Sequence, residues 1–193
     1  CVAGSRLLLH ESIHDKILDQ VARRAKEIRI GDPLEETSQM GPLATLAQLN
    51  NIKSTVVDAT ANGATLIYGG GQPAHLAKGW YCEPTIVDCP NQNLGIVQRE
   101  MFGPVVSVLR FRDEAEAIKL ANDTRYGLAS GVFTTNIGRA LRVTKALRAG
   151  IVWVNTYRMV SPLAPFGGFK DSGYGRESGL DAIYDYTRPK TVW

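Results

Sequence analysis

Apolar residues recur every three or four positions in two stretches of the first third of the chain, which is the spacing of one buried helix face. Ser12, followed three residues later by Asp15, predicts the start of the first helix, and Gly31-Asp32-Pro33 predicts its end. The second helix is expected from about Thr45 to Ala61. The expected buried positions of the two helices are Ile13, Ile17, Val21, Ala25, Ile28, Leu49, Ile52 and Val56.

Short apolar runs between and around these helices predict strands. Arg6 to Leu9 has the pattern of a short buried strand, and Ala64–Tyr68 is a second candidate. The run Trp80–Val87 contains Pro84, and because proline cannot donate to a strand ladder, this run is expected to be an edge strand or an extended arm rather than a central strand.

From Val105 onward, apolar runs alternate with amphipathic ones in the order βαβαβ. This order predicts a parallel α/β sheet with helices on its faces and right-handed crossovers. Because such sheets bind ligands at the carboxyl ends of their strands, the segment Asn155–Phe166 is the expected substrate region. The predicted strands are Val105–Phe111, Ala129–Phe133 and Ile151–Val154, and the predicted helices are Glu114–Asn122 and Ile137–Leu147.

Composition is ordinary for a globular α/β domain and excludes several function classes. The 193 residues are 44% hydrophobic and 21% charged, with a net charge of +3. No dense basic block predicts nucleic-acid binding, and no apolar run has the length of a membrane span. Three cysteines without CxxC spacing indicate a reducing compartment, so a cytoplasmic location is expected.

Cys1 is the first candidate for chemistry, because a thiolate is the strongest nucleophile among the ordinary side chains. The small residues Ala3 and Gly4 would let backbone N–H groups approach an oxyanion formed beside the sulfur. A plain apolar thiol is the simpler interpretation. A third is a self-processing amidohydrolase, in which the α-amino group of Cys1 acts as base, but that class needs antiparallel β layers.

A rival motif is His10-Glu11-Ser12-Ile13-His14, which fits the H-E-x-x-H pattern of zinc metallopeptidases. That chemistry requires both imidazoles on one helix, whereas Ser12 is predicted to cap a helix that starts after His10. Two surface histidines that flank a helix start are the preferred interpretation, and no metal is predicted.

Glu100 and Phe102 precede a Gly-Pro turn that leads into the strand beginning at Val105. A carboxylate there could accept both hydroxyls of a ribose, and the ring could pack against the sugar. The alternative is a capping or salt-bridging Glu beside a core Phe. Phe166, before a Gly-Gly turn, is likewise either a site aromatic or a core aromatic.

Four ordered motifs together resemble the C-terminal part of the NAD(P)-dependent aldehyde dehydrogenase superfamily, over essentially the whole chain. They are the first ten residues, Gln98-Arg99-Glu100-Met101-Phe102-Gly103-Pro104-Val105, the run Pro165-Phe166-Gly167-Gly168-Phe169-Lys170-Asp171-Ser172-Gly173, and Gly175-Arg176-Glu177.

The resemblance implies a fold and a set of roles. The fold would be an α/β catalytic domain over residues 1–170, with a parallel sheet and helices on both faces. Residues 171–193 would form a tail with an oligomerisation strand at Tyr186–Trp193. Cys1 would be the nucleophile that oxidises a small aldehyde through a thioester. The ribose of NAD or NADP would be held by Glu100 and Phe102, and the aldehyde tunnel would be lined by Phe166, Met159 and Val160.

In the family the general-base glutamate, the side-chain amide of the oxyanion hole and the dinucleotide-binding domain precede the cysteine. The chain is therefore expected to be part of a longer homo-oligomeric enzyme, a dimer or tetramer, and to be inactive alone. A non-catalytic structural or interaction fragment is the alternative. The apolar residues near Phe166 disfavour a charged aldehyde, unless Arg158 points inward.

Overall fold

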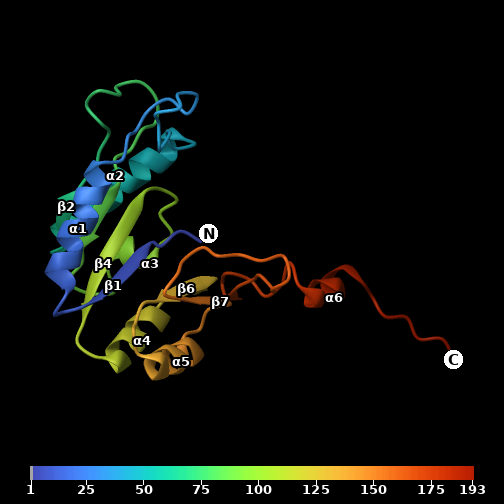
Figure 1. Ribbon diagram of the computed structural model, residues 1–193. Coiled ribbons are helices and arrows are strands. Elements are labelled where there is room, and N and C mark those ends of the chain that lie inside the picture. The colour runs from blue at the N-terminus through green and yellow to red at the C-terminus, as the bar shows by residue number, and fades with distance from the viewer. Residues whose placement is uncertain (1) are drawn as a thin grey trace. The chain divides into compact units, whose positions relative to one another are not determined.

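The computed structural model describes residues 2–193, which fall into two compact units (Figure 1). The first, here the N-terminal unit, is Gly4–Asp113. The second, here the C-terminal unit, is Glu114–Trp193 together with Val2 and Ala3. Among the described residues, no helix is long and apolar enough to cross a membrane.

The N-terminal unit is built on a four-stranded sheet with the order β1-β4-β3-β2. β1 and β3 each pair in parallel with β4, and β2 pairs antiparallel with β3. The strands are β1 (Arg6–His10), β2 (Thr65–Tyr68), β3 (Thr85–Asp88) and β4 (Val105–Phe111).

Helices cover both faces of this sheet, as predicted. α1 (His14–Lys26) packs against Ile86 and Val108, whereas α2 (Leu46–Ala61) and α3 (Gly95–Gln98) pack against Val87 and Leu109. Because successive strand residues point to opposite faces, the apolar runs of β3 and β4 supply both cores at once.

The predicted helix starts differ in accuracy. α2 begins close to the predicted position, with a capping box in which the Thr45 hydroxyl accepts from Gln48 N. The cap predicted at Ser12 is wrong, because α1 begins at His14 with Ile13 as its N-cap residue. Ser12 instead hydrogen-bonds the His10 ring at 2.8 Å.

The prediction that Trp80–Val87 is an edge strand or an extended arm rather than a central strand is wrong for its last three residues, since β3 lies between β2 and β4. Pro84 stands immediately before the strand, where the ladder does not need its missing N–H. The first ladder donor is Thr85 N, which donates to Pro104 O at 2.6 Å.

The C-terminal unit contains the predicted alternation of helices and strands. β6 and β7 pair in parallel, and the short strands β5 and β8 pair antiparallel. A single βαβαβ sheet does not form, because β4 belongs to the four-stranded sheet while β6 pairs only with β7. The elements are α4 (Glu114–Asn122), β5 (Tyr126–Gly127), β6 (Ala129–Val132), α5 (Ile137–Ala146), β7 (Ile151–Val154), β8 (Phe169–Lys170), η1 (Leu180–Ala182) and α6 (Ile183–Tyr186).

His14 is completely buried, which corrects the prediction that it is a surface residue. Its Nδ1 lies 2.9 Å from Asp15 Oδ1, and its Nε2 lies 3.1 Å from Asp88 Oδ1. Arg110 contacts both carboxylates, at 3.0 Å and 3.6 Å. This cluster joins the start of α1 to β3 and β4.

Replacing His14 by Leu keeps the volume of the side chain and removes both hydrogen bonds. We expect the free energy of unfolding to fall by about 1–3 kcal/mol at pH 7, because Asp88 loses a buried partner. The hydrogen bond from His14 is the main cause that lowers the pKa of Asp15 below its ordinary value of 3.8. The ionised Asp15 carboxylate therefore stabilises the folded state above pH 3.8, and this stabilisation is lost as the pH falls below the lowered pKa.

Urea unfolding of the parent and His14→Leu at pH 7 and below pH 4 measures both effects. The difference between the two proteins should shrink as the pH falls. His75→Leu, at an exposed histidine, is the matched control. Equal stability of His14→Leu and the parent at pH 7 would contradict a structural role for the cluster.

Candidate functional site

The turn before β4 holds Phe102 out of the core. Met101 is only 4% exposed, and Gly103 lies so close to Ile52 of α2 that a side chain there would collide with it. Between these two anchored residues Phe102 has φ +49° and is 65% exposed. The alternative of a core phenylalanine is therefore wrong.

A left-handed backbone is costly for a phenylalanine, and residues held this way cluster at functional sites. The anchoring of Met101 and Gly103 supplies the constraint that keeps Phe102 in place. Glu100, two residues earlier, is also exposed. The turn thus offers a ligand a carboxylate, which can accept hydrogen bonds from ribose hydroxyls, and an aromatic ring, which can pack against the sugar.

Parallel pairing of β1 and β4 fixes the edge at which this turn lies. Arg6 pairs with Ser107, and Ser107 N donates to Ser5 O at 2.9 Å. The segments that lead into β1 and β4 therefore enter the sheet at the same edge, the amino edge. Cys1, five residues before β1, lies outside the described residues, so its predicted role stays a prediction.

In the C-terminal unit the loop after β7 is tied down at its start. Asn155 pairs with Thr134 through both side-chain atoms, and Trp153 Nε1 donates to Met159 O at 2.7 Å. The Tyr157 ring packs edge-on against Trp153 with centroids 4.8 Å apart. Trp153 is not among the residues predicted from the sequence. The signal that could have indicated its role is an aromatic residue near the end of a strand that precedes a candidate loop.

Two of the predicted tunnel residues lie on this tied loop. Met159 and Val160 are 68% and 70% exposed. Phe166 is partly buried at the far end of the loop, where its backbone forms a two-way bridge with Glu177 at 2.6 Å and 2.7 Å. These residues share one loop, and nothing in the fold buries Met159 or Val160 in a core.

Two motifs that are separate in sequence meet in space beside Phe166. Gly167 lies against Gly175 O, where a side chain would not fit, and Arg176 Nη1 donates to Gly168 O at 2.9 Å. Close backbone packing therefore requires a glycine at position 167, whereas a side chain at Gly175 would meet only Asp185, at an ordinary contact distance. The contact between the two motifs supports the loop.

The remaining chemical candidates have structural roles. His10 lies in β1 and His14 in α1, so the two rings do not share the helix that an H-E-x-x-H zinc site requires. Over residues 2–193, no three His, Cys, Asp or Glu side chains gather in a way that could hold a metal. Burial raises the pKa of the Cys89 thiol to about 11 and also raises the pKa of Cys82, which makes both poor nucleophiles.

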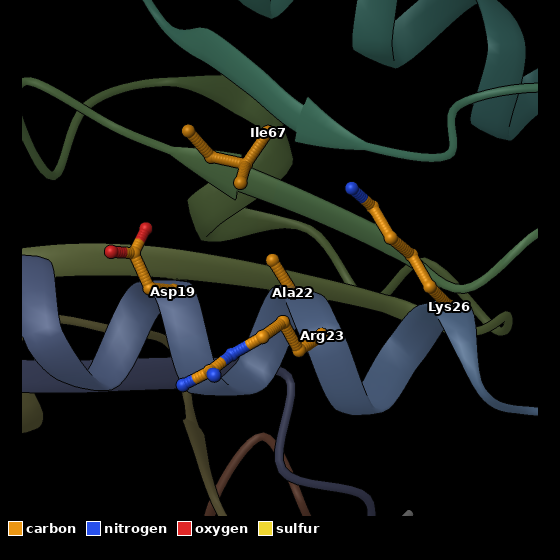
Figure 2. Close-up of a pocket in the computed structure, with 5 residues that line it drawn as sticks. All are labelled: Asp19, Ala22, Arg23, Lys26 and Ile67. Carbon is orange, nitrogen blue, oxygen red and sulfur yellow. The ribbon is translucent and has the colours of Figure 1, made fainter.

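A hollow of about 540 Å³ opens between α1 and β2 in the N-terminal unit (Figure 2). Lys26, on its rim, lies 5.7 Å from the centre of the Tyr68 ring. Among the described residues, none of those predicted to contact cofactor or substrate lines this hollow. Its lining residues are Asp19, Ala22, Arg23, Lys26 and Ile67.

Comparison with known proteins identifies the class. Residues 1–192 match the model of the aldehyde dehydrogenase family, and the chain belongs to this family. Over its full length it is 54% identical to (Z)-2-((N-methylformamido)methylene)-5-hydroxybutyrolactone dehydrogenase of Acinetobacter baylyi and 45% identical to aminoaldehyde dehydrogenase 2 of Zea mays.

Solved structures agree with this assignment. The NAD⁺ complex of betaine aldehyde dehydrogenase from Staphylococcus aureus superposes with a TM-score of 0.92 at 42% identity and covers 96% of the chain. The chain spans 39% and 38% of the lengths of the two relatives named above and 37% of the solved chain.

The burial of Cys82 and Cys89 predicts that neither thiol reacts in the folded protein, because each combines a raised pKa with a closed environment. Alkylation with iodoacetamide at pH 8, followed by peptide mass mapping, should leave both unmodified until urea is added. Rapid modification of either one in the folded state would contradict this.

Proposed function

We propose that the chain is the thiol-bearing part of an enzyme that oxidises an aldehyde to a carboxylic acid with NAD or NADP. The observation that carries the proposal is the exposed, strained Phe102 beside Glu100, in a chain whose family is established. The conformation of this turn costs folding energy, and binding of a ligand is a reason to retain it.

The reaction begins at Cys1. Its thiolate attacks the aldehyde carbonyl and forms a thiohemiacetal, and the backbone N–H of Cys1 partly stabilises the negatively charged oxygen. The nicotinamide cofactor, when bound, supplies the acceptor for the hydride that leaves this carbon. Water then hydrolyses the thioester on Cys1, which releases the carboxylic acid and restores the thiol.

Glu100 and Phe102 fit the sugar of such a cofactor. The Glu100 carboxylate is an acceptor for two ribose hydroxyls, and the exposed Phe102 ring offers a face to the sugar. The NAD⁺ complexes of the Staphylococcus aureus relatives support this cofactor class.

Met159, Val160 and Phe166 form the aldehyde side of the proposed site. The loop that bears them is fixed by Trp153 and Asn155, so its exposed apolar side chains cost little further entropy when a substrate covers them.

The rest of the machinery is proposed to lie in a further portion of the same enzyme. Because the chain spans about two fifths of its relatives, that portion would hold the general base, the oxyanion amide and the dinucleotide-binding domain. Within the chain, residues 1–170 would act as the catalytic domain, and the exposed stretch Tyr186–Trp193 of the tail would pair with another subunit of a dimer or tetramer. The free thiols of Cys82 and Cys89 support a cytoplasmic location.

The names of the relatives do not agree on which aldehyde is oxidised. Betaine aldehyde bears a quaternary ammonium group, whereas the hydroxybutyrolactone named for the Acinetobacter baylyi relative is uncharged. The relatives therefore share the reaction class and differ in the charge of the substrate.

The proposal is tested with the full-length polypeptide that contains these residues. NADH formation from a panel of small aldehydes should be measurable by absorbance, and Cys1→Ser should lower kcat about a thousandfold or more. The 193-residue chain alone should give no turnover. Full activity of Cys1→Ser would contradict the thiol mechanism, and robust turnover by the isolated chain would contradict the need for a further portion.

Glu100→Gln and Phe102→Ala test the cofactor contact. Each should raise KM for the dinucleotide about tenfold, because a hydrogen bond to a charged group or an aromatic packing contact is removed. Neither change should alter KM for the aldehyde by a comparable factor. Glu36→Gln, at another exposed loop glutamate, is the control. An unchanged dinucleotide KM in both variants would remove these residues from the site.

A further inference from the structure

The loop at 155–164 has an unusual charge pattern for a site that would accept cationic aldehydes. Arg158 is its one charged residue, and the loop has no carboxylate. The large exposed apolar side chains of the same loop are those of Met159, Val160 and Leu163. Recognition of a quaternary ammonium group needs carboxylates or several aromatic faces, whereas a guanidinium repels it.

Arg158 is held in position by its neighbours. Its φ is +63°, a left-handed conformation that is uncommon for a long side chain. The two residues beside it are anchored: the Tyr157 ring packs on Trp153, and Met159 O accepts from Trp153 Nε1. A single aromatic thus fixes the backbone on both sides of Arg158 and stores local strain at this position.

The guanidinium of Arg158 is available to a ligand. Arg125, Arg139 and Arg142 of the same unit are ion-paired with Asp171 or Glu114. Over residues 2–193, by contrast, no carboxylate forms an ion pair with Arg158. Arg158 also lowers the pKa of the Tyr157 phenol, which burial raises more strongly, so its positive charge acts on the neighbouring ring. An exposed loop whose one charge is a guanidinium without a carboxylate partner among the described residues favours an anion.

We infer, on the basis of the proposed function, that Arg158 sets the charge preference of the enzyme and selects aldehydes that bear a carboxylate away from the reacting carbonyl. The guanidinium would pair with that carboxylate while the apolar side chains of Met159 and Val160 cover the carbon chain between the two ends. A trimethylammonium aldehyde would meet like charge at the same point and would be rejected.

The test compares three aldehydes of similar length with the full-length enzyme: 4-oxobutanoate, butanal and trimethylammonioacetaldehyde. The parent should prefer 4-oxobutanoate in kcat/KM. Arg158→Gln should lower kcat/KM for 4-oxobutanoate about 10- to 100-fold, as expected for loss of a charge-assisted hydrogen bond. The same variant should leave butanal within about twofold and raise the value for the cationic aldehyde.

Two further variants separate a charge effect from a change in loop structure. Arg158→Lys should restore part of the preference, because it keeps the charge and loses the planar fork. Arg148→Gln, at an exposed arginine elsewhere in the same unit, should leave all three ratios unchanged.

The outcomes distinguish the two levels of inference. If the parent oxidises none of the aldehydes, the proposed function fails. If it oxidises butanal but Arg158→Gln changes all three substrates by the same factor, or changes none, the reaction class stands and the selectivity assigned to Arg158 is overturned. A parent that prefers the trimethylammonium aldehyde also overturns it.

Discussion

Parallel pairing between β1 and β4 is the constraint on which the candidate site depends. The two strands are about a hundred residues apart in sequence, and their ladder aligns Arg6 with Ser107. Because parallel strands enter a sheet from the same side, the segment that follows Cys1 and the turn that bears Glu100 and Phe102 reach one edge of the sheet. An antiparallel or slipped pairing would send the two segments to different edges or faces.

At that edge the packing of α2 determines what the turn can offer a ligand. Ile52 fills the space that a side chain at position 103 would need, and Met101 is buried in the same core. Phe102, between them, has a left-handed backbone conformation and is largely exposed. The packing of the core around Met101 and Gly103 therefore also sets the geometry of this turn, and a change in that packing would move Phe102.

The loop after β7 is held in place by a different set of contacts. Trp153, at the end of a parallel strand, donates to the backbone of Met159 and packs against Tyr157. The loop is therefore preorganised by one side chain that never needs to touch a substrate. At its far end Gly167 packs against the backbone of Gly175, and the Arg176 side chain donates to Gly168 O. Fixing the backbone of a loop before binding lowers the entropy cost of ordering it around a ligand.

Local pattern in the sequence was sufficient for the elements and for the family. Amphipathic spacing predicted α1 and α2, and the alternation after Val105 predicted α4, β6, α5 and β7. The motifs around Glu100 and Phe166 identified the aldehyde dehydrogenase family, which the match over residues 1–192 shows. These features depend on neighbours within a few positions along the chain, so a single sequence contains them.

Contacts between distant residues were decided only by the tertiary structure. The buried ring of His14 forms a hydrogen bond with Asp88, which is 74 residues away in the sequence. Nothing near position 14 in the sequence indicates this partner. β3 is an interior strand because β2 and β4 pair with it on either side. β4 and β6 belong to different sheets because β4 pairs with β1 and β3, whereas β6 pairs with β7. Close contact with Ile52 of α2 restricts position 103, next to the exposed Phe102. The order of residues determined the elements, whereas the packing of remote side chains and the choice of strand partners determined what each element presents.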